Sequence, residues 1–159
     1  MIRTGWGFDA HRFGGEPPIV LGGAVVDQSR GVQATSDGDV VAHAVTDALL
    51  GAANLGDLGT HFPSSDPAWA NADSLGLLAR AARMARDAGF ELRFVDVTVL
   101  AEDIKIAPHR GHIRAGLARA LDLDASVVSV KATTTDGMGF VGDGEGLAAS
   151  AVVTVEAAP

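Results

Sequence analysis

Two periods of apolar and polar residues run through the chain and predict its secondary structure. Five stretches have the short, partly alternating and β-branched pattern that is typical of β-strands. They are residues Ile2–Asp9, Ile19–Val26, Leu92–Ala101, Val127–Thr133 and Leu147–Val155. Gly22 and Gly23 predict a bulge or a tight bend inside the second of these strands.

Three further stretches carry apolar residues at helical spacing. They predict helices from about Asp39 to Asn54, from Asp73 to the residue before Gly89, and from Pro108 to about Leu121. Ser36 and Asp37 offer an N-cap for the first helix, and Gly56 offers its stop. Residues 57–72 predict a loop, and the glycine-rich residues 136–146 predict a turn-rich connection.

The order of these elements predicts the fold class. Strands, two helices, a strand, a helix and two strands follow one another within 159 residues, a length that suits one domain. We therefore expect a single domain over residues 1–159 with an α/β (α+β) fold, in which helices cover one face of a mixed β-sheet.

Composition narrows the possible chemistry. The chain has no cysteine, so any zinc must be bound by imidazole and carboxylate groups. A net charge of −8 argues against a nucleic-acid partner. A bound phosphate would therefore need metal ions, backbone N–H groups or a local concentration of basic residues. Without a signal-like apolar core or an apolar run of about 18–20 residues, we expect a cytoplasmic protein with no membrane segment.

Asp9, His11 and His43 form the first candidate site. Asp9 and His11 lie two residues apart at a predicted strand end, so both side chains point to one face of the sheet. Two imidazoles and one carboxylate, with a fourth position open, are a common catalytic zinc set, and Asp47 is placed to orient the His43 ring. The alternative is a surface Asp-x-His pair and a helix histidine with local hydrogen bonds. Spacing alone favours that alternative, because Asp-x-His is short and common.

Two hydroxyl-bearing segments form further candidates. Residues Thr35–Asp39 precede the first predicted helix, where hydroxyls and free N–H groups can bind an anion. Residues Lys131–Gly137 contain three threonines, which can hold phosphate oxygens together with turn amides, and Asp136, which can bind a divalent cation. Taken separately, an ordinary N-cap and an edge strand explain these two segments better.

Taken together and in this order, the motifs resemble those of one family, the 2-C-methyl-D-erythritol 2,4-cyclodiphosphate synthases. The resemblance covers nearly the whole chain, and its most specific part is the block from Ser36 to Pro63. The segments that carry it are Gly7–His11, Ser36–Val40, Asp47–Ala52, Gly56–Gly59, Phe62–Pro63, Val130–Asp136 and Gly144–Gly146.

The resemblance implies a homotrimer whose sheets face the central axis and whose active sites lie between subunits. It also implies the reaction, which belongs to non-mevalonate isoprenoid biosynthesis. The 2-phosphate of 4-diphosphocytidyl-2-C-methyl-D-erythritol 2-phosphate attacks the β-phosphorus, closes an eight-membered ring and releases CMP.

The resemblance further implies two kinds of metal site. Carried over by position, Asp9, His11 and His43 hold one Zn²⁺ per subunit, which polarises the β-phosphate. Asp136 holds an Mg²⁺ or Mn²⁺ ion that bridges the phosphates of the diphosphate. Thr134 matches a threonine that stabilises the transition state.

Substrate contacts are implied along several parts of the chain. Residues 57–66 enclose the erythritol end, and residues 101–107 form a cytosine pocket in which backbone groups read the base. The expected substrate-binding residues are Asp9, His11, Thr35, Ser36, Asp57, Leu58, Gly59, Phe62, Pro63, Ser64, Ser65, Asp66, Ala101, Glu102, Asp103, Ile104, Lys105, Ile106, Ala107, Thr133, Thr134, Thr135, Asp136, Phe140 and Asp143.

Several positions depart from the family pattern. Thr35 takes the catalytic position where the family usually has a histidine, so we expect a lower rate or compensation by another donor. Asp143 stands where many relatives have an arginine near an apolar axial cavity that can hold an isoprenoid diphosphate, which argues against anion binding there. Ile104 and Ser64 also differ from common residues, and we expect Ile104 to have little effect.

Three other interpretations are open. Thr35 and Asp143 suggest a catalytically impaired relative that still binds zinc and cytidine nucleotides. The metal set alone also suits a zinc-dependent phosphohydrolase, although the sequence singles out no general base and the block from Ser36 to Pro63 is then unexplained. A purely structural zinc domain is disfavoured, because three protein ligands leave the metal's coordination open.

Overall fold

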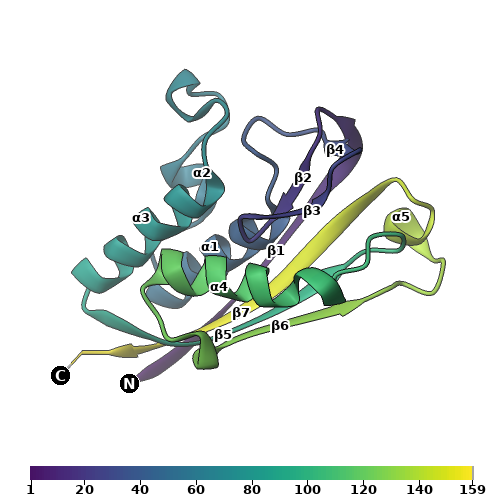
Figure 1. Ribbon diagram of the computed structural model, residues 1–159. Helices are drawn as coiled ribbons and strands as arrows, with labels where there is room; N and C mark the ends of the chain where they lie inside the picture. Colours follow the sequence, from purple (N-terminus) through teal and green to yellow (C-terminus); the bar gives the residue numbers. More distant parts are fainter. Residues whose placement is uncertain (159) are drawn as a thin grey trace.

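A five-stranded mixed sheet forms the frame of the computed structural model, which describes residues 1–158 (Figure 1). Its strands are β1 (Ile2–Gly15), β4 (Gly31–Val32), β5 (Phe90–Leu100), β6 (Val128–Thr133) and β7 (Gly146–Ala157). They lie in the order β4-β1-β7-β5-β6, in which the β5–β6 pair is parallel and the other pairs are antiparallel. A separate hairpin pairs β2 (Ile19–Leu21) with β3 (Ala24–Asp27).

Three long helices, α1 (Val40–Ala53), α3 (Ser74–Asp87) and α4 (Arg110–Leu121), lie on one face of the sheet (Figure 1). α1 packs on β1 and β7, α4 packs beside β6, and α3 contacts both helices. Shorter helical segments are α2 (Leu58–His61), α5 (Gly139–Gly142) and the 3₁₀ turns η1 (Pro67–Trp69), η2 (Ala107–His109) and η3 (Ala125–Val127). The predicted α/β domain with one helix-covered face is confirmed.

The crossing of β1 and α1 is unusually close, and two glycines make it possible. A Cβ atom on Gly5 would lie 1.9 Å from the carbonyl oxygen of Ala48, and one on Gly7 would lie 2.1 Å from that of Ala44. Only a residue without a side chain allows the two backbones to approach in this way. The crossing places the first half of β1 directly against the stretch of α1 from Ala44 to Ala52.

Apolar side chains fill the space between the helices and the sheet. Valines 95, 97, 99, 153 and 155 line the sheet side, and Val41, Val45 and Leu49 line the α1 side, all of them buried. Each fully buried side chain of this size stabilises the fold by about 1.5–3 kcal/mol. The core therefore holds the crossing of β1 and α1 rigidly.

The opposite face of the sheet is open in the single chain. Because side chains alternate along β1, Trp6 and Phe8 point away from the face that Gly5 and Gly7 turn toward α1. Trp6 is 66% exposed, Phe8 43% and Phe94 of β5 42%. The two β1 rings stack with centroids 6.2 Å apart.

Several predicted boundaries were wrong. The strand predicted over residues 2–9 continues to Gly15, so Asp9 and His11 lie in mid-strand rather than at its end. The strand predicted over residues 19–26 is a hairpin, since Gly22 and Gly23 adopt φ values of 54° and 77° at its turn. The N-cap of α1 is Asp39 instead of Ser36 or Asp37.

The two predicted irregular segments contain short helices. Residues 57–72 include α2 and η1, which are capped by the Asp57 and Asp66 carboxylates, and residues 136–146 include α5. A single helical turn is too short to show helical periodicity in a sequence. Among the described residues, no helix is long and apolar enough to cross a membrane.

Candidate active site

Asp9, His11 and His43 converge where β1 crosses α1. The His43 Nδ1 atom lies 2.9 Å from Asp9 Oδ2, and the His11 Nε2 atom lies 3.2 Å from the same oxygen. One possible ligand atom from each residue lies within 4.8 Å of the others. The structure therefore brings together the three residues that the sequence singled out, on the helix-covered face of the sheet.

The charges of the three side chains are strongly coupled. Burial raises the pKa of Asp9, but the interactions with His11 and His43 outweigh it and lower that pKa to about 2. Burial lowers the pKa of His43, but the hydrogen bond and charge of Asp9 outweigh this effect and raise it above the ordinary value. The cluster is thus an ionised carboxylate that draws positive charge toward itself.

The donor set fits a divalent metal ion. The buried His11 Nε2 atom lies 3.2 Å from Asp9 Oδ2 but forms no well-aligned hydrogen bond with any described residue, and a buried polar atom in this position normally costs free energy. A metal ion bound between the two rings and the carboxylate would satisfy it. One oxygen and two nitrogen ligands match a catalytic site that keeps a fourth position open.

The far side of the His43 ring faces hydroxyl groups. Its Nε2 atom lies 2.8 Å from Ser74 Oγ and 3.3 Å from Ser36 Oγ. The Asp47 carboxylate, expected to orient this ring, instead accepts a 2.7 Å hydrogen bond from the Leu58 backbone N–H. Ser74 was missed, because nothing in the sequence shows that the first residue of α3 lies against α1.

The start of α1 is occupied by its own cap. The fully buried Asp39 carboxylate accepts hydrogen bonds from the backbone N–H groups of Ala42, Gly22 and Gly23. Thr35 is exposed, and its carbonyl oxygen accepts a hydrogen bond from the Asn71 N–H. The predicted anion site relied on free N–H groups at the start of α1, but the Asp39 carboxylate already accepts from the Ala42 N–H. Only the hydroxyls of Thr35 and Ser36 remain as donors of that site.

A pocket of about 470 Å³ lies at the ends of β5 and β6. It is lined by much of the expected cytosine segment, by Pro108 and Arg110, and by the threonine-rich segment that follows β6. The lining residues are Ala101, Glu102, Ile104, Lys105, Ile106, Ala107, Pro108, Arg110, Ala132, Thr133 and Thr134. The structure thus joins two segments that the sequence could assign only separately, but this pocket does not include Asp9, His11 or His43.

The threonine turn beside this pocket is held by Glu102. Its carboxylate accepts hydrogen bonds of 3.2 Å from the backbone N–H groups of Thr135 and Gly137. These two amides were expected to be available to phosphate, and Glu102 occupies them instead. Thr134 and Asp136 remain exposed, and Asp136 adopts a φ of 55° at the turn.

The segment expected to enclose the erythritol end lies over α3. Asp57 Oδ1 accepts hydrogen bonds from the N–H and hydroxyl of Thr60, so one carboxylate oxygen caps α2. Phe62 is buried and packs edge-on against Trp69, with ring centroids 5.1 Å apart. Its neighbours Pro63, Ser64, Ser65 and Asp66 are exposed or half-buried.

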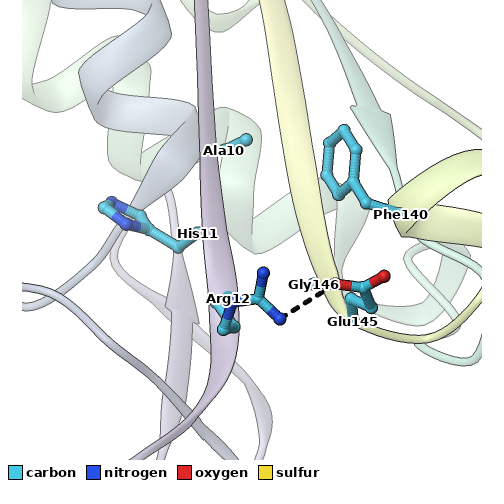
Figure 2. Close-up of a pocket in the computed structure, with 6 residues that line it drawn as sticks. All are labelled: Ala10, His11, Arg12, Phe140, Glu145 and Gly146. Atoms are coloured by element: carbon cyan, nitrogen blue, oxygen red, sulfur yellow. Dashed lines mark hydrogen bonds and ion pairs between the residues drawn. The ribbon is translucent and has the colours of Figure 1, made fainter.

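Figure 2 shows a second, smaller pocket of about 190 Å³ beside β1 and β7. Arg12 points across it and forms a 2.8 Å ion pair with Glu145, and the Phe140 ring forms another wall. Arg12 was not among the predicted site residues. Its ion-pair partner Glu145 lies two residues after Asp143 in the sequence. Asp143 itself is exposed.

Comparisons with known proteins all point to one family. The family model described as the YgbB family matches residues 2–156. The 2-C-methyl-D-erythritol 2,4-cyclodiphosphate synthase of Halorhodospira halophila is 52% identical over 160 residues, which cover 100% of this chain and 98% of the relative. The synthase of Pectobacterium atrosepticum is 54% identical over 151 residues, covering 95% and 92%.

Solved structures show the same likeness. The bifunctional IspDF of Campylobacter jejuni superposes with a TM-score of 0.96 at 43% identity, and the match covers 99% of this chain and 42% of that protein. The CDP complex of IspF from Plasmodium falciparum superposes with a TM-score of 0.85 at 28% identity, covering 99% and 97%. The comparisons lend no support to the interpretation of the chain as a catalytically impaired relative.

Proposed function

Since the chain belongs to the YgbB family, it is a lyase that forms 2-C-methyl-D-erythritol 2,4-cyclodiphosphate and CMP, and we propose which of its residues carry out this reaction. The observation that carries the proposal is the convergence of Asp9, His11 and His43 at the crossing of β1 and α1. The remaining residues are assigned from the family resemblance, and those of the nucleotide end also from their position around the pocket at the ends of β5 and β6.

Asp9, His11 and His43 are proposed to hold Zn²⁺. The ion would supply positive charge to the β-phosphate, which an acidic chain with a net charge of −8 cannot easily provide from its side chains. The chain contributes the rigid crossing that keeps the three ligand atoms together. Ser36 and Thr35 lie on the segment that leads from the neighbouring loop into α1, where their hydroxyls can donate to phosphate oxygens.

The pocket at the ends of β5 and β6 is proposed to bind the cytidine diphosphate part of the substrate. Backbone groups of residues 101–107 would read the cytosine, and the Thr134 hydroxyl would stabilise charge on the reacting phosphate. Asp136 would bind Mg²⁺ or Mn²⁺ between the phosphates. Glu102 supports this arrangement because it fixes the backbone of the turn that carries both residues.

Closure of the ring needs little beyond positioning and charge. The attacking 2-phosphate oxygen and the β-phosphorus belong to one molecule, so the enzyme has to hold them in line rather than recruit a second reactant. The new phosphorus–oxygen bond forms as the bond from the β-phosphorus to the CMP oxygen breaks. Asp57 and the segment from Phe62 to Asp66 are proposed to hold the erythritol end and exclude water.

A homotrimer would complete the site. In one chain the metal cluster lies at β1 and α1, whereas the nucleotide pocket lies at β5 and β6 with β7 between them. The exposed Trp6, Phe8 and Phe94 on the open face of the sheet are the kind of apolar patch that a second copy covers. We therefore propose that neighbouring subunits each supply one part of every active site.

Phosphorus NMR of the reaction tests the proposal. The purified protein is incubated with 4-diphosphocytidyl-2-C-methyl-D-erythritol 2-phosphate, Zn²⁺ and Mg²⁺, beside the variants His43→Ala and His112→Ala. His112 is an exposed histidine on α4 and serves as the matched control. We expect equal amounts of CMP and cyclodiphosphate from the wild type and His112→Ala, and none from His43→Ala.

Other outcomes would redirect the interpretation. CMP together with a linear phosphorylated product would show hydrolysis, and the metal cluster would then be a water-activating site. Bound CMP without turnover in the wild type would contradict the synthase activity. Full activity of His43→Ala would contradict the role of the cluster.

A further inference from the structure

A chain of hydrogen bonds connects the His43 ring to Ser74 and Asp37 on the side of the ring away from Asp9. Ser74, the first residue of α3, is fully buried, and its Oγ atom lies 2.8 Å from His43 Nε2. The same hydroxyl donates a short hydrogen bond to Asp37 Oδ1. A hydroxyl has one proton to donate, so Ser74 Oγ can only accept from the imidazole.

Asp37 is held so that it acts as an acceptor. Its Oδ2 atom accepts a 3.0 Å hydrogen bond from the Ser74 backbone N–H, and its Oδ1 atom accepts one of 3.2 Å from the Asp39 N–H. A carboxylate that already accepts two backbone hydrogen bonds is a fixed acceptor for the Ser74 hydroxyl as well. Ser36 adds a weaker contact at 3.3 Å, and it accepts from the Gly38 N–H.

The consequence for the imidazole is a defined orientation. Nε2 donates to Ser74 Oγ, so Nδ1 is the ring nitrogen that faces Asp9 Oδ2, at 2.9 Å. In the metal-free chain a proton on Nδ1 makes this contact a hydrogen bond, and a metal ion bound by His43 and Asp9 would replace that proton. Asp37 therefore orients Ser74, and Ser74 orients the His43 ring so that Nδ1 faces the metal cluster.

We infer that Ser74 and Asp37 are positioning residues that hold His43 in its metal-binding orientation. The inference rests on the proposed role of His43 as a metal ligand and assigns the partners that prepare it. Such outer partners commonly change metal affinity by about 10–100-fold when they are removed. The arrangement also ties the start of α3 to the metal cluster.

Three variants of the full chain separate this role from simple stability. Ser74→Ala removes the acceptor of the Nε2 proton. Asp37→Asn keeps the shape but weakens the final acceptor, because a charged acceptor forms hydrogen bonds about twice as strong as a neutral one. Asp73→Ala is the control, since Asp73 caps the same helix through a 3.3 Å bond from the Leu75 N–H without touching His43.

Two measurements are made on each protein. The zinc dissociation constant is determined by competition with a chelator, with His43→Ala as the reference for loss of the ligand. In the zinc-bound protein, where Nδ1 is occupied by the ion, solvent exchange of the His43 Nε2–H proton is followed by proton–nitrogen NMR. A purely structural role of Ser74 would lower stability without changing this exchange rate.

We expect zinc affinity to fall about 10–100-fold in Ser74→Ala and on the order of tenfold in Asp37→Asn. The Nε2–H proton of zinc-bound His43 should exchange slowly with solvent in the wild type and in Asp73→Ala, and faster in Ser74→Ala, where its acceptor is lost. If Ser74→Ala does not fold, Asp37→Asn decides the question.

The inference is overturned if Asp37→Asn and any folded Ser74→Ala bind zinc within about twofold of the wild type. A His43 Nε2–H proton that exchanges equally fast in the zinc-bound wild type and in Ser74→Ala also overturns it. A separate outcome would contradict the proposed function rather than this inference alone. If His43→Ala binds zinc as tightly as the wild type, the ion does not bind at His43, and the metal assignment itself is wrong.

Discussion

Replacing Gly7 by alanine tests whether the backbone contact between β1 and α1 sets the geometry of the metal cluster. The added Cβ atom would lie 2.1 Å from the Ala44 carbonyl oxygen and 2.7 Å from the Ala48 nitrogen, whereas ordinary contacts begin at 3.4 Å. Both obstructing atoms belong to the helix backbone and cannot rotate away. The helix must therefore move from the strand by about 1.3 Å.

Such a displacement has two measurable costs. Overpacking of a core that cannot rearrange typically costs about 1–3 kcal/mol, and we expect the upper end of this range because backbone atoms are involved. Asp9 lies two residues after Gly7, and His43 precedes Ala44, so the same shift separates Asp9 Oδ2 from His43 Nδ1. Metal sites tolerate changes of only about 0.2 Å in ligand distance, so we expect zinc affinity to fall at least about tenfold.

Gly51→Ala provides a matched control on the same helix. A Cβ atom at Gly51 meets no atom within 4 Å, and alanine favours the helix interior by about 0.5–1 kcal/mol over glycine. Gly51→Ala should therefore unfold at a higher urea concentration than the wild type and bind zinc equally well. Gly7→Ala should unfold at a lower urea concentration and bind zinc more weakly. If Gly7→Ala unfolds at the urea midpoint of the wild type and binds zinc equally well, the close crossing is not what sets the site.

Three further predictions concern the surroundings of the site. Arg80→Ala removes a guanidinium 5.3 Å from the centre of the Trp69 ring, and Trp69 packs against Phe62 of the segment proposed to hold the erythritol end. Such a contact is worth about 0.5–1 kcal/mol, so its loss should raise the KM about 2–5-fold at unchanged kcat. Thr35→His should raise kcat about tenfold in steady-state kinetics, because an imidazolium brings positive charge to the phosphate site where the hydroxyl brings only a neutral donor. Asp27→Asn should lower the Tm near neutral pH by an amount equivalent to at most about 1 kcal/mol, because the exposed Arg30 ion pair is lost.

The pH dependence of the Asp27 effect follows from the sign of its pKa shift. The Arg30 side chain, with help from hydrogen bonds at Ser29, holds the pKa of Asp27 well below its ordinary value of 3.8. The stabilisation is therefore present above pH 3.8 and lost as the pH falls through the folded-state pKa. The Tm difference between the wild type and Asp27→Asn should shrink in acid, and a difference that grows there would contradict this cause.

The other two predictions also have contradicting outcomes. An unchanged KM in Arg80→Ala would show that the contact between Arg80 and Trp69 does not support the segment from Phe62 to Asp66. No gain in kcat from Thr35→His would show that the threonine is not rate-limiting. Arg83→Ala is a control for charge, since Arg83 lines the same pocket as Arg80 and Trp69.

Local patterns predicted much of the fold. The apolar spacing of α1, α3 and α4 and the strands around them appear in the structure, because those segments are long enough to show a period. One-turn helices such as α2 escaped prediction, since their stability comes from a carboxylate cap rather than from periodicity. The hairpin of β2 and β3 was merged into one strand because its turn consists of just two glycines.

The candidate site was predictable only in part. Asp9 and His11 could be placed on one strand face because side chains alternate, but the contact with His43 needs the close crossing that Gly5 and Gly7 allow. The position of Ser74 behind His43 depends on how α3 packs against α1. A single sequence carries no signal for such long-range contacts.

The location of the metal is the most direct test of the account. Crystals grown with Zn²⁺ and CDP would be measured on both sides of the zinc absorption edge. The account predicts one anomalous peak per subunit between Asp9 Oδ2, His11 Nε2 and His43 Nδ1, with a phosphate oxygen of CDP in the open position. An anomalous peak elsewhere, or CDP bound away from that ion, would contradict it.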